Sequence, residues 1–198
     1  MAEIFYHGSS ALFDKFDLAH ALEGDGKVKF GYGVYVTQKY GTAAHYAGSG
    51  AGKTASNHYV YTIEVPDMTE DNHLWSNRPV HPTIIERAVT KLGEHIPAEV
   101  VEKGKLFRKY IGNKLNGKCG TVKKLSGSAD IEAEKAASKF LIEIGVELLV
   151  WPYSQTKPDG EQNRAILDDS KVKIVKVESV ELDAEAKLID GSQKEVKI

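Results

Sequence analysis

The most informative segment of the chain is Gly31-Tyr-Gly-Val-Tyr-Val-Thr-Gln-Lys-Tyr-Gly-Thr-Ala-Ala-His-Tyr-Ala47. Its first seven residues are rich in β-branched and aromatic side chains, which predicts a strand over 31–37 with a glycine on either side of Tyr32. The residues that follow predict a helix over 38–47, closed by Gly48. The segment therefore predicts a strand that leads directly into a short helix.

Elsewhere the strand patterns lie near both ends of the chain and the helix patterns lie in the middle. The other predicted strands are 3–7, 58–65 (ended by Pro66), 146–151 and one or two within 164–177. The other predicted helices run from Pro82 to Gly93, over the basic segment near residue 110, and from an Asp130 N-cap to Gly145. Residues 48–57 and 154–160 are predicted loops. This order favours an α+β fold over a doubly wound sheet.

Composition is that of an ordinary folded domain. The 198 residues are 41% hydrophobic and 27% charged, which favours one domain with a full core. Cys119 is the only cysteine, so disulfide scaffolds and zinc fingers are excluded and a reducing, cytoplasmic environment is expected. No apolar run approaches the length of a membrane span, and the amino-terminal residues lack a signal-peptide pattern.

Positive charge is concentrated in one segment. The chain has a formal net charge of −2, yet residues 103–124 hold eight Lys or Arg and no Asp or Glu. One interpretation is a nucleic-acid or phosphate contact. The other is an amphipathic helix with a solvated lysine face, and the two interpretations are compatible. The candidate nucleic-acid contacts are Lys103, Lys105, Arg108, Lys109 and Lys114.

Two familiar motifs are rejected. Residues 47–54 suggest a phosphate-binding P-loop, but Ala47 occupies the position that requires glycine, and the segment precedes a strand. The seven histidines show no spacing typical of a metal site, so no metal is expected.

A resemblance to a known family rests on two segments. Tyr6-His-Gly-Ser9 and the segment 31–47, in which Tyr46 follows Tyr35 by eleven residues, resemble the first two motifs of the ADP-ribosyltransferases of the diphtheria-toxin and poly(ADP-ribose) polymerase branch. The resemblance implies a split antiparallel β-sheet core with flanking helices, and NAD⁺ bound in a cleft between two small sheets.

The resemblance continues near the carboxyl terminus but departs from the family pattern at one position. Residues 135–151 and 163–175 look like the closing helix and strands of small bacterial and phage-encoded relatives. Counting back five residues from Asp168 gives Asn163, where this branch has its catalytic glutamate. Glu161, two residues earlier, is the nearest acid that could substitute, on the same face of an extended strand. This departure weakens the expectation of polymer formation more than that of NAD⁺ binding.

The remaining segments are expected to belong to the same domain. Residues 68–129 match no part of the family pattern and are interpreted as a helical, basic insertion that reads the target. Residues 183–198 are charged and are expected to fray.

The resemblance implies roles for individual residues. Catalytic roles fall on His7, Tyr35, Tyr46 and either Asn163 or Glu161. NAD⁺ contacts fall on His7, Gly8, Ser9, Gly33, Tyr35, Ala43 and Tyr46. Two tyrosine rings suit a flat cationic pyridinium, and a glycine leaves its backbone open to the carboxamide.

The expected function is mono-ADP-ribosyl transfer from NAD⁺, without a metal, to a macromolecule. Nucleic acid, RNA or DNA, is the first expectation for the target and protein the second. The resemblance also implies a toxin or anti-phage effector, with an antitoxin as a partner. Two alternatives stay open: an NAD⁺ glycohydrolase, and an inactive module that binds NAD⁺ or ADP-ribose.

Overall fold

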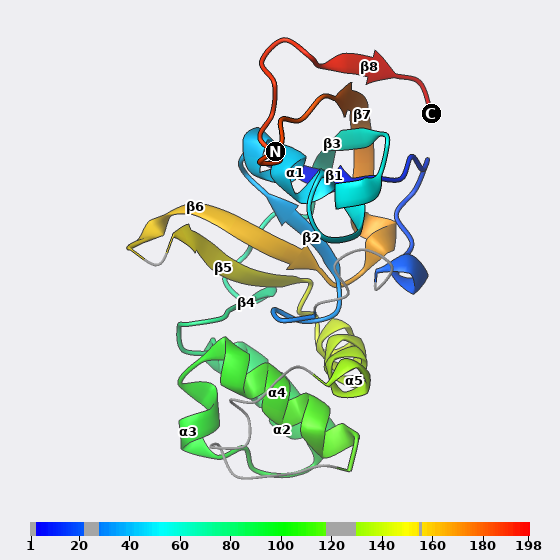
Figure 1. The fold of residues 1–198 in the computed structure, drawn as a ribbon. Helices are drawn as coiled ribbons and strands as arrows, with labels where there is room; N and C mark the ends of the chain where they lie inside the picture. Colours follow the sequence, from blue (N-terminus) through cyan, green and yellow to red (C-terminus); the bar gives the residue numbers. More distant parts are fainter. Residues whose placement is uncertain (1–2, 22–27, 118–129, 155) are drawn as a thin grey trace.

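The computed structural model describes residues 3–21, 28–117, 130–154 and 156–198 (Figure 1). These residues form a mixed α+β fold with one mostly antiparallel sheet of order β4-β5-β6-β2-β1-β3-β7-β8. The strands are β1 (Glu3–Ser9), β2 (Val34–Thr37), β3 (His58–Val65), β4 (His73–Trp75), β5 (Leu148–Ser154), β6 (Lys157–Ile166), β7 (Lys173–Val180) and β8 (Lys194–Val196). The helices are α1 (Tyr40–Ala47), α2 (Pro82–Leu92), α3 (Ala98–Val101), α4 (Gly104–Leu115) and α5 (Ile131–Glu143). The predicted α+β class is confirmed.

The sheet is divided between β1 and β2. Strand β1 pairs with β3 along its whole length, but it pairs with β2 only at Tyr6↔Thr37. On the other side of this boundary, β2 pairs with β6 at four positions and β6 pairs with β5. We call the boundary between β1 and β2 the seam. It separates a half made of β1, β3, β7 and β8 from a half made of β2, β4, β5 and β6 (Figure 1).

Helix α1 packs closely on β1. A Cβ at Gly8 would lie 1.7 Å from the Ala43 carbonyl oxygen, so only glycine allows this approach of strand and helix. Ala43, Ala44, Val60 and Val180 form the small core between them. The helix thus buries its alanine face against β1 and leaves Tyr46 exposed.

The other helices form a separate module below the sheet (Figure 1). Helix α2 begins at Pro82 and ends before Gly93, which has a positive φ of 70°. The Asp130 carboxylate caps α5 by accepting from the Ala133 amide at 3.1 Å. Helices α4 and α5 meet at Gly112, where a Cβ would lie 2.2 Å from the Ala133 carbonyl oxygen. Their apolar faces share one core with Leu149, Trp151 and Ala165 of the sheet.

The structure differs from the sequence-based expectations in four respects. The strand expected over 31–37 begins only at Val34, because Gly31 has a φ of 116°. The loops expected at 48–57 and 154–160 contain a short 3₁₀ helix and the start of β6. Strand β4 had no signal in the sequence.

The expected frayed tail is the fourth difference, and that expectation is wrong. Strand β8 pairs with β7, and Leu182 and Leu188 pack against the core beneath α1. The Ser192 hydroxyl accepts from the Glu181 amide at 3.0 Å. The packing of Leu182 and Leu188 and this hydrogen bond therefore order a segment that its charged composition had predicted to fray.

The part of the chain that the structure describes lacks two features, a membrane-spanning helix and a group of metal ligands. None of the described helices is long and apolar enough to cross a membrane. Nor do three His, Cys, Asp or Glu side chains in those residues gather as metal ligands do. Cys119 and the lysines at 118, 123 and 124 lie outside the described residues.

Candidate functional site

His7 lies at the seam and bridges its two sides. Its Nδ1 is 2.8 Å from the backbone carbonyl oxygen of Tyr35 on β2. Because a carbonyl oxygen only accepts, Nδ1 carries the proton. Burial lowers the pKa of His7, against a smaller opposing effect of the bond to Tyr35, so the ring is neutral near pH 7. Its Nε2 therefore presents a lone pair that accepts a hydrogen bond.

Aromatic rings hold the His7 imidazole in place. Phe16 contacts it edge-on with ring centroids 5.0 Å apart, and Phe13 and Tyr61 lie near 6 Å. The Tyr61 hydroxyl fixes this wall, because it accepts from the Phe13 amide at 2.8 Å and donates to the Ala11 carbonyl at 3.0 Å. Among the described residues, the structure gives Nε2 no protein partner. An accepting lone pair thus remains on an imidazole that the surrounding rings hold in place.

Tyr35 uses its hydroxyl within the protein. The oxygen accepts from the Phe30 amide at 3.0 Å and donates to the Gly31 carbonyl at 2.8 Å. Burial raises the pKa of Tyr35 to about 12, so the donor persists at any working pH. The ring lies 5.4 Å from that of Trp151. The Tyr35 hydroxyl is therefore engaged within the protein, and its ring packs against the core beside Trp151.

The glycines and Ala43 of the motifs have packing roles. Gly8 admits α1, as described above, and a Cβ at Gly33 would lie 2.6 Å from the Ile166 carbonyl oxygen. Ala43 is 1% exposed against β1. The Ser9 hydroxyl oxygen accepts from the Ala11 amide at 3.0 Å, and its O–H stays available as a donor. Gly33 and Ala43 therefore have packing roles in the structure, and their contact with NAD⁺ stays a prediction.

A groove lies beside α1. Its volume is about 500 Å³, and we call it the groove throughout. Its lining residues are Lys39, Gly41, Thr42, His45, Tyr46, Tyr153, Lys187 and Leu188. Tyr46 is 61% exposed, and the Lys39 ammonium lies 4.5 Å from the centroid of the Tyr153 ring. Two aromatic rings and two lysines suit a ligand that combines a flat ring with negative charge.

Both candidates for the third motif lie on β6. Asn163 pairs with Thr37 of β2 and Trp151 of β5, and its side chain is partly buried. Glu161, two residues away and on the same strand face, is exposed and lies 2.7 Å from Lys39 Nζ. The hydrogen bond from Lys39 to Glu161 raises the pKa of the lysine. Glu161 is thus a charged partner of Lys39 at the rim of the groove.

The structure brings the predicted residues together in two groups. His7 contacts Tyr35 across the seam, whereas Tyr46 lines the groove with Lys39, the partner of Glu161. Tyr35 does not line the groove. The two tyrosines expected to form one clamp are thus held by different neighbours.

The structure contradicts one prediction made for the basic segment, the one that concerns Arg108. Arg108 is 1% exposed and forms an ion pair with Glu134 at 2.7 Å, so its predicted contact with nucleic acid is wrong. Lys114 pairs with Glu94, while Lys103, Lys105 and Lys109 keep exposed surface. Burial and the neighbouring Lys105 lower the pKa of Lys109.

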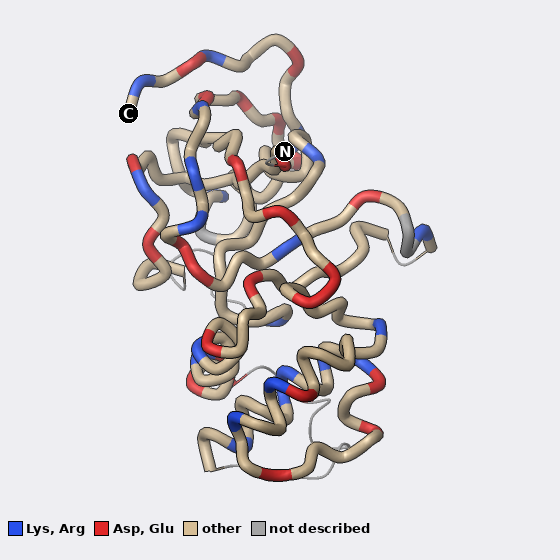
Figure 2. The backbone as a smooth tube through the Cα atoms, turned by 180° about the vertical axis from the view of Figure 1, so that it is seen from behind, with Lys and Arg blue, Asp and Glu red and all other residues tan. Residues whose placement is uncertain are grey.

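The helical module contains both Lys or Arg and Asp or Glu residues along its backbone, as the colours in Figure 2 show. Phe107, Tyr110 and Ile111 are buried, as the amphipathic interpretation requires, but Leu115 is 47% exposed. The solvated-face interpretation therefore describes most of α4.

Several residues of the site carried no signal in the sequence. Lys39, Tyr153 and Lys187 are far apart in the chain, and no motif connects them. The aromatic wall of Phe13 and Phe16 follows from a loop held by Tyr61. Comparison of the chain with family models, curated proteins and solved structures gives no significant match.

Proposed function

We propose that the chain is an ADP-ribosyltransferase that cleaves NAD⁺ and transfers ADP-ribose to a macromolecule, with an ADP-ribosyltransferase-like split sheet as its fold. The observation that carries the proposal is the neutral His7 at the seam, whose Nδ1 is bound to the Tyr35 carbonyl and whose Nε2 accepts. This geometry agrees with the motif resemblance, in which the same His contacts a ribose hydroxyl.

The residues fit the chemical groups of NAD⁺. The Nε2 of His7 would accept from a ribose hydroxyl, and the exposed Tyr46 ring in the groove would stack against the pyridinium. Nicotinamide is the leaving group, and its departure develops positive charge on the ribose. The Asn163 amide oxygen would stabilise that charge as a dipole. A carboxylate there would stabilise it more, by about 3 kcal/mol or roughly a hundredfold in rate.

Nucleic acid is the first proposed target and protein the second. Lys39 and Lys187 in the groove, with Lys103, Lys105 and Lys109 on α4, offer positive charge to phosphates. The motif resemblance supports a cytoplasmic toxin or anti-phage effector, restrained by an antitoxin.

The test is release of nicotinamide from NAD⁺ by the purified protein. It is run with no acceptor, with RNA, with single- and double-stranded DNA, and with cell-extract protein. We expect release that rises with one class of acceptor. Equal release without acceptor would instead indicate the glycohydrolase.

Asn163 favours a second candidate, a module that binds NAD⁺ without cleaving it, because an amide stands where the family has an acid. The variant Asn163→Ala separates the two. Lost turnover with retained binding supports transfer. A parent protein that binds NAD⁺ but releases no nicotinamide under any condition supports the module.

A further inference from the structure

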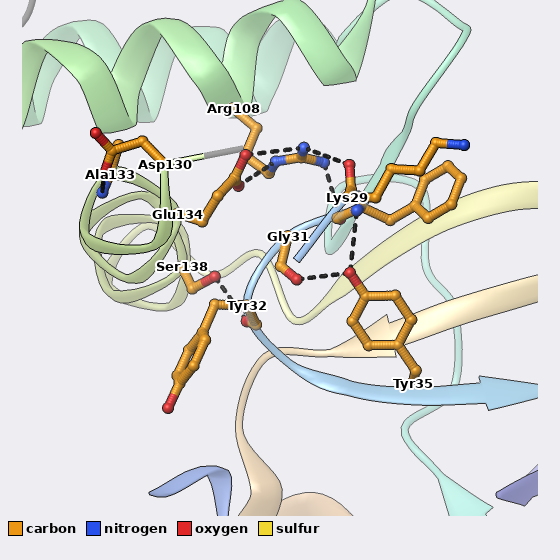
Figure 3. A network of polar contacts seen from close by, with 10 residues as sticks. Lys29, Gly31, Tyr32, Tyr35, Arg108, Asp130, Ala133, Glu134 and Ser138 are labelled. Atoms are coloured by element: carbon orange, nitrogen blue, oxygen red, sulfur yellow. Dashed lines mark hydrogen bonds and ion pairs between the residues drawn. The ribbon is translucent and has the colours of Figure 1, made fainter. Parts of the chain in front are cut away.

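Arg108 connects the helical module to residues 29–31, which lie just before β2 (Figure 3). We call these three residues the turn. Its Nε and Nη2 donate to the Glu134 carboxylate at 2.7 and 3.2 Å. Its Nη1 donates to the Phe30 carbonyl at 2.8 Å, and Nη2 also donates to the Lys29 carbonyl at 3.3 Å. One buried guanidinium therefore joins α4, α5 and the turn.

The same turn is held from its other side by Tyr35. The Tyr35 hydroxyl bonds the Phe30 amide and the Gly31 carbonyl, so Arg108 and Tyr35 both hold Phe30 (Figure 3). Gly31 has a φ of 116°, and a Cβ there would lie 2.2 Å from Leu149 Cδ1. The turn has little freedom while both partners are present.

Tyr35 links this turn to the seam. Its hydroxyl binds the turn, and its backbone carbonyl accepts the Nδ1–H of His7. A continuous series of hydrogen bonds thus runs from Glu134 through Arg108, the turn and Tyr35 to His7. The turn residue Phe30 also stacks on Trp151, with centroids 4.2 Å apart and planes within 1°.

We infer that Arg108 is a positioning residue of the active site, which acts through the turn to orient Tyr35 and His7. The inference rests on the proposed function. It gives the inserted helical module a part in the NAD⁺ site besides the reading of a target. Arg108 itself touches no substrate.

The chemistry of the Arg108–Glu134 ion pair favours a role in positioning the turn over a role in stabilising the fold. A buried ion pair is often no more stabilising than apolar side chains of similar volume. The planar fork of arginine, however, serves a carboxylate and two carbonyls at once, which a lysine ammonium on a flexible stem does not reproduce. Gly112 already brings α4 and α5 together without the pair.

The decisive variant replaces both partners, Arg108→Met with Glu134→Leu. It leaves no buried charge unpaired, but the Phe30 and Lys29 carbonyls lose their donor, so we expect it to fold with a melting temperature somewhat below that of the parent. It removes one of the two anchors of the turn, and we expect kcat for nicotinamide release to fall at least tenfold, because small misplacements of catalytic groups are costly. The Kd for NAD⁺ is expected to rise by a smaller factor than kcat falls, and Arg108→Lys with Glu134 kept is expected to lose kcat as well.

A readout without NAD⁺ comes from Trp151. In a Trp75→Phe background Trp151 is the only tryptophan, and its stacking on Phe30 makes its emission report on the turn. We expect the double variant and Tyr35→Phe to shift this emission in the same direction, and their combination to add little to either. The control is Glu143→Gln, which removes an ion pair between α5 and Lys91 of α2 in the same helical module and makes no bond to the turn.

The outcomes separate the inference from the proposed function. A folded double variant with parental kcat and unchanged Trp151 emission overturns the inference. A parent protein that neither binds NAD⁺ nor releases nicotinamide overturns the proposed function, and with it the assignment of Arg108 to that site. A tenfold loss of kcat with shifted emission, absent from the Glu143→Gln control, supports both.

Discussion

The seam and the groove hold their candidate residues in different ways. At the seam, each polar group of His7 and Tyr35 that the protein uses has a partner within 3.0 Å, and aromatic rings surround the imidazole. In the groove, Tyr46 is 61% exposed and Tyr153 is 45% exposed, and the ion pair of Lys39 with Glu161 faces solvent.

This difference separates preorganisation from adaptation. Residues at the seam are positioned before a ligand arrives. Because the same contacts belong to the folded core, a substitution at the seam also affects stability. Residues in the groove are free to adjust to a ligand and contribute little to stability. We therefore expect seam substitutions to change both stability and activity, and groove substitutions to change activity alone.

The largest expected effect is that of Tyr46→Ala in the groove. Loss of the exposed ring should lower nicotinamide release at least about a hundredfold, equivalent to about 2.7 kcal/mol. The free energy of unfolding should change by less than about 0.5 kcal/mol, because the side chain is exposed. Circular dichroism and thermal melts check the fold, with the exposed Leu115→Ala as a control for both measurements. Parental turnover in Tyr46→Ala would remove the groove from the site.

The second effect concerns Gly8 at the seam. A Cβ in Gly8→Ala would lie 1.7 Å from the Ala43 carbonyl, which should lower the free energy of unfolding by about 2 kcal/mol or more. Gly41→Ala in the same helix α1 is the matched control, because a Cβ there has no neighbour within 4 Å. That control should be neutral or slightly stabilising in urea unfolding. Equal effects of the two substitutions would contradict the close packing of α1 on β1.

The third effect is the pH dependence set by His7. The proposed catalysis requires the neutral ring of His7. Burial lowers its pKa below the ordinary value of 6.5. The side chains that face the ring are Phe13, Phe16 and Tyr61, which carry no charge near neutral pH. We expect kcat/KM to be highest where the ring is neutral, toward pH 8, and to fall about tenfold per unit below the folded pKa. His7→Gln, which keeps an acceptor, should lose this decline. A midpoint above 6.5 would contradict the assignment.

The same shift affects stability. The folded pKa of His7 lies below its unfolded value, so the unfolded chain binds more protons just below pH 6.5. The contribution of His7 to stability is therefore complete above pH 6.5 and is lost as the pH falls toward the folded pKa. His73, whose pKa burial also lowers, acts in the same direction, so the His7→Gln comparison is needed to isolate His7.

The smallest expected effect belongs to Glu161→Gln. Its ion pair with Lys39 is exposed, so unfolding should change by less than about 0.5 kcal/mol. If Asn163 fills the third motif, nicotinamide release should change less than about threefold. A loss of about a hundredfold would give that role to Glu161 instead.

Local chemistry made several elements predictable. Pro66 ends β3, Pro82 and Gly93 bound α2, and the Asp130 carboxylate caps α5, each through contacts within a few residues. The contact between His7 and β2 followed from no such local pattern. Only the motif resemblance assigned His7 and Tyr35 to one site.

The rest depended on contacts between distant parts of the chain. Strand β2 is shorter than predicted because the turn at Gly31 is held by Arg108, which is 77 residues further along the sequence. Arg108 itself lies in a run of lysines, and composition does not distinguish a buried guanidinium from a solvated one. The groove needs Lys187, which the packing of Leu182 and Leu188 brings to α1.

The most direct test of the seam as an NAD⁺ site is nitrogen NMR of histidine-labelled protein during a titration with NAD⁺. His7→Gln identifies the His7 signals. We predict a neutral ring at pH 7 with the proton on Nδ1, and an Nε2 resonance that moves as NAD⁺ binds. An imidazolium, a proton on Nε2, or an Nε2 resonance that stays in place up to millimolar NAD⁺ would contradict the account.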